Sequence, residues 1–338
     1  MATLSLLSPD DERWRAFATE HATSPLQHPA WLDTLTGAYG LSAQVEALTD
    51  SQGALLAALP LIRSKLPWRN RWTSLPFTDY AEPVAVDDAR RDELLLAIAN
   101  DPDSPAIIVR TNCDVPGWFS KQVGTVQTVD LSDGLDGVLR RANKKTRQNV
   151  KIGRRPENGL TAAPISSKNE FLGAHLALIA DSRHRVGAPT QPRRYWARLW
   201  EMHERHEALT IGVYASGEIT ASAVFLIGRN HAVAKYSAST AATVRRRTNY
   251  LALATAVDHL AQLGVQAMDF GVSDLHNESL REFKTRWGGE ERPAYFSATR
   301  ADLLPDTIEP GRLLTRTIQS TPVFVGRSLG ALAYPFAG

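Results

Sequence analysis

The residues of this chain best suited to chemistry lie between positions 265 and 289. The alternating apolar segment 265–272 predicts a strand that carries Asp269, and a short loop then leads to an amphipathic helix with Lys284 and Arg286. A carboxylate on a strand and cations on the next helix can form a site for an anionic or carbonyl-bearing ligand.

Lys284 stands between Phe283 and Trp287, which helical spacing directs toward the core. We therefore expect Lys284 near the boundary between core and solvent. There its ammonium group could stabilise the oxyanion that forms when an amine attacks an acyl carbonyl. The alternative is a solvated lysine on a helix surface.

Asp269 is expected to end the buried strand, and two interpretations of it stay open. In the first, it is a structural carboxylate that caps the following loop or pairs with Arg286. In the second, it is a base or an anchor for an amine nucleophile, because folds of this kind place ligands at the carboxyl ends of strands.

Basic residues are concentrated in one segment. Between Leu139 and Arg155 the sequence has eight Lys or Arg and no acid, although the net charge of the chain is only +2. This pattern indicates either a phosphate-rich partner or a charged surface helix. The eight residues are Arg140, Arg141, Lys144, Lys145, Arg147, Lys151, Arg154 and Arg155.

A second basic group precedes a predicted helix at 249–263 and consists of Arg245, Arg246 and Arg247, followed by Thr248 and Asn249. A helix N-terminus favours anions, and Thr248 can act as a cap. Three arginines and a hydroxyl at this position could bind phosphate through their side chains.

Composition restricts the class of protein. The chain has 338 residues, of which 43% are hydrophobic and 22% charged, so we expect a folded protein of two domains. No apolar run is long enough to span a membrane, the start lacks the features of a signal peptide, and the single cysteine, Cys113, excludes an internal disulfide. We expect a cytoplasmic protein. No Gly-x-Ser-x-Gly, Walker or His-Glu-x-x-His motif occurs, and no metal is expected.

The predicted elements suggest two similar halves. The second half reads as a strand, two helices, a three-strand meander, a helix, a strand, a helix and a strand, and the first half follows a looser version of this order. His203 and His206 are interpreted as surface residues of a helix at 192–206. The apolar end of the chain, 328–336, is expected to pack on the body, with contact to a membrane surface or a partner as the alternative.

Several motifs, in this order, resemble the FemA/FemB-like branch of the GNAT acyltransferases. They are the basic element Lys145–Lys151, the Arg/His-rich loop 183–192 and the segment Phe-Lys-Thr-Arg-Trp-Gly-Gly at 283–289; the loop 76–83 also fits the family. The resemblance implies an α/β fold with a mixed sheet and tandem GNAT-like domains. The expected divisions are 1–138, a basic connector 139–156, 157–300, and a tail 301–338 that packs on the body.

The resemblance also implies roles for individual residues. Lys284 would stabilise the oxyanion, Asp269 would orient the nucleophile, and the residues from Arg245 to Asn249 would hold the phosphates of an acyl-CoA or aminoacyl-tRNA donor. The glycine-rich loop that acyl-CoA GNAT proteins carry at this junction is absent here, which leaves room for aminoacyl-tRNA. The residues expected to bind substrate are Lys145, Arg147, Lys151, Arg183, Arg185, Tyr80, Tyr236 and Arg286.

The resemblance implies transfer of an acetyl or aminoacyl group to an amine on a small molecule or a cell-envelope precursor, with tRNA and a membrane surface as further partners. One alternative is an acyl-CoA-dependent N-acetyltransferase of a sugar nucleotide or small amine. The other is a non-catalytic binding protein that retains the fold. The basic segment 139–155 contains no aromatic residue for stacking on bases, which favours the enzyme.

Overall fold

The computed structural model describes residues 2–64, 71–304 and 312–321. Among these residues the chain divides into two compact units. The first unit comprises residues 2–64, 71–125 and 292–304, and the second comprises 126–291 and 312–321. Strands β7 (Phe119–Asp130) and β13 (Glu290–Ala298) each have residues in both units.

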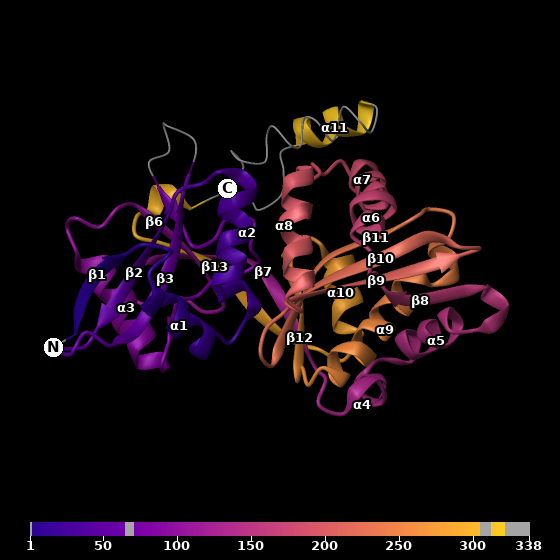
Figure 1. Ribbon diagram of the computed structural model, residues 1–338, viewed down its shortest axis with the longest axis horizontal. Coiled ribbons are helices and arrows are strands. Elements are labelled where there is room, and N and C mark those ends of the chain that lie inside the picture. The colour runs from indigo at the N-terminus through magenta and orange to yellow at the C-terminus, as the bar shows by residue number, and fades with distance from the viewer. Residues whose placement is uncertain (1, 65–70, 305–311, 322–338) are drawn as a thin grey trace. The chain divides into compact units, whose positions relative to one another are not determined.

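The first unit is a sheet with helices on both faces (Figure 1). Its strands follow the order β1-β2-β3-β4-β6, with β5 paired to β3 and residues 295–298 of β13 paired to β6. Its remaining elements are β1 (Thr3–Leu7), α1 (Glu12–His21), a 3-10 turn (Pro25–Gln27), α2 (Pro29–Tyr39), β2 (Ala43–Thr49), β3 (Leu55–Arg63), β4 (Trp72–Thr73), β5 (Val84–Ala85), α3 (Asp88–Asn100), β6 (Ile107–Thr111) and a 3-10 turn (Ala301–Leu303).

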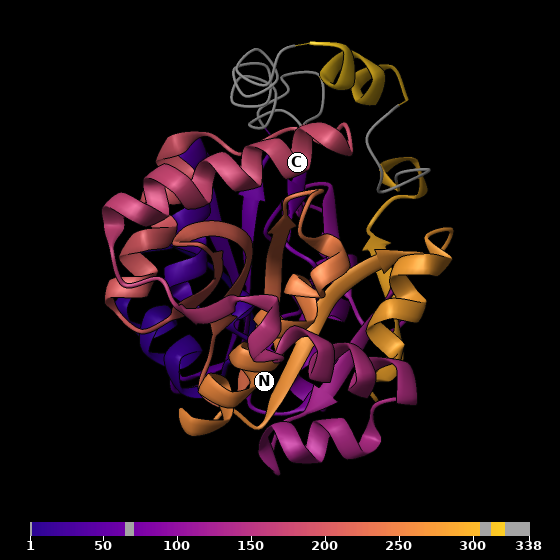
Figure 2. The same ribbon diagram turned by 90° about the vertical axis from the view of Figure 1, so that its right-hand side faces the viewer.

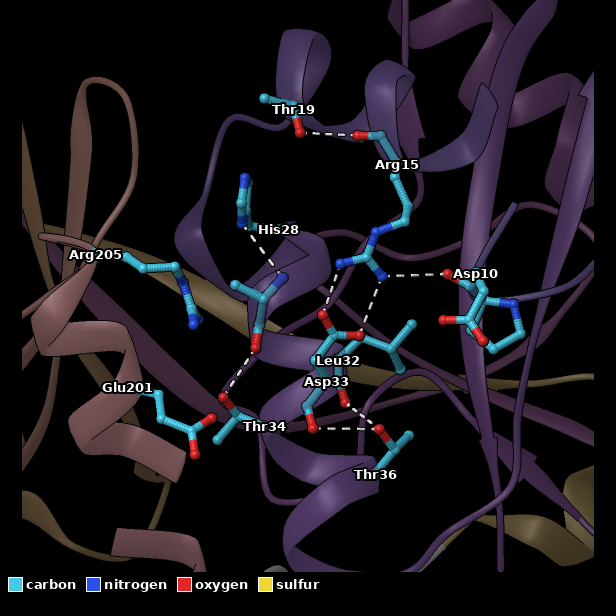
Figure 3. A network of polar contacts seen from close by, with 12 residues as sticks. Asp10, Arg15, Thr19, His28, Leu32, Asp33, Thr34, Thr36, Glu201 and Arg205 are labelled. Carbon is cyan, nitrogen blue, oxygen red and sulfur yellow. Dashed lines mark hydrogen bonds and ion pairs between the residues drawn. The ribbon is translucent and has the colours of Figure 1, made fainter. Parts of the chain in front are cut away.

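The core of this unit lies on both faces of the sheet, and the side chains of β2 alternate between the two faces. Val45 and Ala47 pack with Trp14 and Phe17 of α1, whereas Leu48 packs with Leu94 and other residues of α3. This alternation is the two-residue period of a strand that is covered on both faces. Arg15 of α1 also bonds to Asp33 of α2 through both of its terminal nitrogens, at 3.1 and 2.7 Å, and so ties the two helices together (Figure 3).

The second unit is built on the strand order β7-β12-β11-β10-β9-β8. Its helices and strands are α4 (Gly134–Arg141), α5 (Lys144–Gly153), a 3-10 turn (Pro156–Asn158), β8 (Leu160–Pro164), α6 (Lys168–Glu170), a π-helical turn (Phe171–His175), α7 (Leu176–Arg185), α8 (Arg193–Glu204), β9 (Ala208–Ala215), β10 (Glu218–Ile227), β11 (His231–Ser239), a 3-10 turn (Val244–Arg246), α9 (Thr248–Gln262), β12 (Ala267–Asp274), α10 (Glu278–Thr285) and α11 (Arg312–Ser320).

Helices cover both faces of these strands. Figures 1 and 2 both show α7 and α8 on one face and α4 and α5 on the opposite face. The main core of this unit lies under α9, where Leu253 and Val257 pack against Phe225 of β10 and Met268 of β12. Both faces are therefore buried by helices, which is why β10 reads as an almost continuous apolar run.

The helices and strands expected from the sequence are largely confirmed. The predicted three-strand meander is formed by β9, β10 and β11. The helices predicted at 192–206 and 249–263 and the strand predicted at 265–272 are α8, α9 and β12, and each differs from its predicted bounds by one or two residues at an end. The predicted loop 183–192 is partly wrong, because Arg183, His184 and Arg185 form the last turn of α7. The expected apolar tail, 328–336, lies outside the described residues.

No helix among the described residues is both long and apolar enough to cross a lipid bilayer.

The segment after α10 makes a tight contact with the end of α4. Trp287 is fully buried, and Gly288 follows it with φ +83°. A Cβ atom on Gly288 would lie 2.8 Å from the backbone carbonyl carbon of Arg141, closer than such atoms approach. Only glycine fits here, because both the backbone conformation and the space exclude a side chain.

We predict that Gly288→Ala lowers the unfolding free energy by about 3 kcal/mol or more, since it adds a backbone clash to left-handed strain. The matched control is Gly217→Ala, because Gly217 has the same φ of +83° but open space around it. That control is expected to cost only about 1–2 kcal/mol. Urea denaturation of the full chain measures both values, and equal losses would contradict the clash.

Candidate functional site

The parallel strands β11 and β12 separate within the second unit. Their register covers three residue pairs, from His231 opposite Ala267 to Val233 opposite Asp269. Strand β11 then continues to Ser239 and β12 to Asp274. Strand β11 also bulges here, because Val224 and Phe225 of β10 oppose Tyr236 and Ala234 and skip Lys235. We call residues 234–236 and 270–272 the fork. Ligands of α/β folds bind at such carboxyl ends of parallel strands.

Lys284 reaches the fork from α10. Its Nζ donates a 2.7 Å hydrogen bond to the carbonyl oxygen of Gly271, which has a left-handed φ of +70°. The side chain is not at the boundary between core and solvent, as the sequence suggested, because Lys284 is only 6% exposed. The predicted burial of Trp287 is confirmed, and the partly buried Phe283 packs against the same core.

Asp269 lies two residues before Gly271 and is fully buried. It is the third residue of β12 and does not end the strand, as was predicted. Its neighbours Met268 and Phe270 belong to the core under α9, so strand alternation directs Asp269 to the opposite face. The predicted pairing with Arg286 is wrong, because Arg286 bonds to Glu282 one helical turn away on α10.

The partners of Asp269 come from the two neighbouring strands. Nε2 of His231 in β11 lies 3.0 Å from Oδ2 of Asp269, and the Thr128 hydroxyl of β7 donates to Oδ1. The sequence analysis missed both partners. The one usable signal was that a carboxylate inside a buried strand requires partners, but the strand order that supplies them is a long-range property.

Tyr236 of β11 takes part in a polar cluster with residues next to and within α8. Its hydroxyl lies 2.8 Å from that of Tyr195 and accepts a 2.9 Å hydrogen bond from Nε2 of Gln191. Its ring lies 5.1 Å from that of Trp196. This cluster combines hydroxyl groups with an aromatic wall, and such a combination can orient a polar acceptor.

The start of α9 has several polar groups without partners. Arg247, the residue before the helix, has a left-handed φ of +65°, although it is not a glycine, and no side chain caps the helix. The Thr248 hydroxyl, the Asn249 side-chain oxygen and Nε of Arg247 are all enclosed without a hydrogen-bond partner among the described residues. Strain and unsatisfied groups at a helix N-terminus are typical of an anion-binding site.

The basic segment forms helices as expected, but it is not free of countercharges. Arg140 pairs with Asp133, Arg141 with Asp130 and Asp133, Arg154 with Asp258, and Arg155 approaches Glu157. These acidic partners lie outside residues 139–155 in the sequence, so the composition of that segment alone did not predict the ion pairs. Lys145 and Lys151 are exposed on α5.

Helix α5 contacts the end of α10 with its first residues and the start of α9 with its last residues. At its beginning, the Asn143 backbone N–H donates a 2.9 Å hydrogen bond to the carbonyl oxygen of Arg286. At its end, a Cβ atom on Gly153 would lie 3.1 Å from the Arg247 carbonyl oxygen, so the two backbones touch. A guanidinium nitrogen of Arg246 also donates to the Asn158 carbonyl just after α5. The structure therefore brings the basic segment next to Arg246 and Arg247.

The other predicted substrate-binding residues have structural partners. Nε of Arg183 donates to the Pro189 carbonyl at 2.6 Å, Arg185 donates to the Ser239 carbonyl, and Arg147 donates to the Ala142 carbonyl. Tyr80 belongs to the first unit, is 6% exposed, and accepts a 3.5 Å hydrogen bond from the Ser24 hydroxyl. These contacts position loops and helix ends.

Two histidines are packed among aromatic residues of the π-helical turn and of α8. The fully buried His175 stacks on Phe171 within the π-helical turn, and His203 stacks on Trp200. Burial lowers the pKa of His175 to about 4 and that of His203 to about 4. The expectation that His203 is a surface residue is therefore wrong, since its ring packs on aromatic neighbours and its Nε2 lies 3.0 Å from the Thr210 hydroxyl.

This burial predicts a loss of stability in acid. An unfolded His175 binds a proton near pH 6.5, but the folded one does so only near pH 4. The unfolding free energy should therefore fall as the pH decreases from 6.5 to 4, by up to about 3 kcal/mol for this residue. His175→Gln, which has no such proton to bind, should reduce this dependence in thermal melts across that range. His276→Gln changes an exposed histidine and should leave it unchanged, and identical pH profiles for both variants would contradict the assignment.

A second prediction concerns Asp269. Asp269→Ala removes the acceptor of both His231 and Thr128 and should lower the unfolding free energy by about 2–4 kcal/mol. Asp269→Asn keeps one acceptor oxygen and should lose clearly less. Urea denaturation distinguishes the two variants. A wild-type stability for Asp269→Ala would show that the fold does not need this carboxylate and would leave a role in function.

Comparisons with known proteins agree with this arrangement. Residues 138–314, more than half of the chain, match the family model described as "Acetyltransferase (GNAT) domain". No curated protein matches the sequence closely enough to count as a relative. 

Three solved structures resemble the whole chain at low sequence identity. FemX has a TM-score of 0.68 and 16% identity, with 87% of this chain and 96% of FemX covered. L-PGS from Bacillus licheniformis has a TM-score of 0.56 and 16% identity over 93% of this chain and 98% of that chain. A tandem GNAT protein from the clavulanic acid biosynthesis pathway has a TM-score of 0.52 and 13% identity over 89% and 99%. The predicted α/β fold is confirmed, and the predicted FemA/FemB-like resemblance holds for the fold, which is similar to that of FemX. The chain belongs to the GNAT acetyltransferase family and is an acyltransferase with a FemX-like fold.

Proposed function

We propose that this chain transfers an acyl group from a phosphate-containing donor to an amine at the fork between β11 and β12. The observation that carries the proposal is the buried Lys284 ammonium, which lies against the Gly271 carbonyl where the strands have separated. A cation held on a rigid helix inside a protein stabilises a developing oxyanion more effectively than a solvated one.

The donor's phosphates would bind at the start of α9. The unpartnered Thr248 hydroxyl and Arg247 Nε fit such a group, as does the N-terminal end of a helix of 15 residues. Arg245 is exposed next to them and Arg246 is half-buried, and both can add charge. The family's usual glycine-rich loop is replaced by side chains that can donate hydrogen bonds themselves.

In the transfer step, the amine nitrogen attacks the acyl carbon and the carbonyl electrons move to the oxygen. Lys284 would stabilise this oxyanion. The bond from the acyl carbon to the donor then breaks, and the leaving group departs with its electron pair while the nitrogen loses a proton. Tyr236 and Gln191 would orient the acceptor, and the Asp269–His231 pair would hold β12 and β11 together at the point where they begin to separate.

An aminoacyl-tRNA donor is favoured by the length of the basic surface. Lys145 and Lys151 are exposed along α5, whose end touches the start of α9, and several phosphates of an acceptor stem could lie along such a surface. The likeness to FemX, to L-PGS and to the C-terminal domain of a putative lysylphosphatidylglycerol synthetase from Agrobacterium fabrum supports an aminoacyl donor and a cell-envelope acceptor. Acyl-CoA is the second candidate, since the unpartnered groups of Arg247 and Thr248 are few enough to suit a single pyrophosphate. The clavulanic acid neighbour is also described with respect to AcCoA.

We predict that Lys284→Met lowers the turnover number by about 10²–10³-fold because it removes the oxyanion partner. Binding of the donor should change by less than about threefold, since the phosphates bind elsewhere. The measurements are the thermal shift with acetyl-CoA, free CoA and lysyl-tRNA, and then transfer from whichever donor binds to a blocked lysine and to ethanolamine.

Lys168→Met is the matched control, because Lys168 is an exposed lysine on α6 and should retain full activity. Equal turnover in the Lys284 and Lys168 variants, at equal folded fraction, would remove Lys284 from the mechanism. The absence of a thermal shift with every donor would overturn the proposed transferase site itself.

A further inference from the structure

A cavity of about 670 Å³ lies in the first unit and shares no residue with the fork. One side of it is formed by β1 and β2, where the exposed Leu6 pairs with Glu46 and the partly buried Leu4 pairs with Leu48. The other side is formed by the last turn of α3 and the loop that follows, and Trp72 of β4 also lines the cavity.

Glu46 has an unusual position for a carboxylate. Its neighbours Val45 and Ala47 pack toward α1, so alternation along β2 directs Glu46 toward α3, where Leu48 is part of an apolar core. Glu46 is only 7% exposed, yet it lines the cavity. Nε2 of Gln44 donates a 3.0 Å hydrogen bond to Oε1, and among the described residues no other group bonds to this carboxylate. Its second oxygen is not among the enclosed atoms, so a ligand in the cavity can reach this acceptor.

The surroundings of Glu46 are negative. Asp101 and Asp103 line the same cavity from the loop after α3, and the described lining residues include no Lys, Arg or His. Helix α3 also directs its negative end here, and its last turn contains no basic residue. Burial raises the pKa of Glu46, and the Asp101 carboxylate raises it further. A cation in the cavity would offset both effects.

The apolar side chains of the cavity favour a cation that carries an alkyl chain. Leu4 and Leu6 present alkyl surface, Leu6 with 63% of its surface exposed, and the Trp72 ring can contact a cation or a methylene chain. Among the described residues no three His, Cys, Asp or Glu are placed to hold a metal ion. We propose that this cavity binds the primary ammonium group of an aliphatic amine, with Glu46 as its ion-pair partner and with Leu4, Leu6 and Trp72 along its alkyl chain. The site is separate from the proposed transferase site and does not depend on it.

The test is titration of the full chain with n-butylammonium, followed through the indole N–H resonances of the eight tryptophans. The Trp72 signal is assigned with Trp72→Phe. We expect saturable shifts that include the Trp72 signal, and at least tenfold weaker binding to Glu46→Gln. The matched control Glu20→Gln changes an exposed acid of α1 and should bind like the wild type. n-Butanol, which lacks the charge, should not bind.

Two further titrations identify the source of the amine. Tighter binding of spermidine than of a blocked lysine would assign the site to free polyamines. Tighter binding of the blocked lysine would assign it to a lysine side chain of a partner protein. Either result supports the proposal if Glu46→Gln weakens the binding. The proposal is overturned by an absence of saturable binding, by equal affinities of wild type and Glu46→Gln with both proteins folded by circular dichroism, or by Mg²⁺ displacing the amine at equal concentration.

Discussion

The burial of the Lys284 ammonium group against the Gly271 carbonyl is the interaction on which the site of the second unit depends. A charged group that is 6% exposed must have polar partners, and the carbonyl is available because Gly271 adopts a left-handed conformation within β12. The turn that follows this helix contains the buried Trp287 and Gly288, whose backbone lies against Arg141. The motif around Lys284 is therefore a packing unit. Its lysine is held by the core, and the chemistry that we assign to it uses this rigidity.

The local structure could be predicted from the sequence because it is set by periodicity and by turn residues. The strands β9 and β10 are mostly apolar segments that lie between clear turn residues, and the helical spacing of Phe283 and Trp287 predicted the burial of Trp287 in the turn after α10. The partners of charged side chains could not be predicted. Asp269 meets His231 and Thr128 only because β11, β12 and β7 are neighbours in the sheet, and the arginines of the basic segment meet acids from as far away as Asp258. Such pairings depend on the strand order and on helix packing, which single residues in a sequence do not encode.

At the start of α9, side chains occupy the place where acyl-CoA GNAT proteins carry a glycine-rich loop. A left-handed conformation at a non-glycine residue costs about 1–2 kcal/mol, and Arg247 adopts it. A glycine would avoid this cost, but it would also remove a guanidinium group from the start of the helix. Contact with α5 holds Arg247 in this conformation, because its carbonyl lies against Gly153, where no side chain is present. The packing of two helices thus holds a strained residue where it can donate to an anion.

Asp269, Lys284 and Glu46 are buried charged residues in the part of the chain that the structure describes. The partners of each side chain indicate whether its role is structural or is to bind a ligand. Asp269 has bonds from a histidine and a hydroxyl, so it is part of the framework of the sheet. Lys284 donates to the Gly271 carbonyl at a point where two strands diverge, which suits a group that both holds the fold and meets a substrate. Glu46 receives a single bond from an amide and faces a cavity with further acids around it. A ligand with a positive charge would offset the cost of burying this carboxylate among other acids, and we therefore assign Glu46 a binding role.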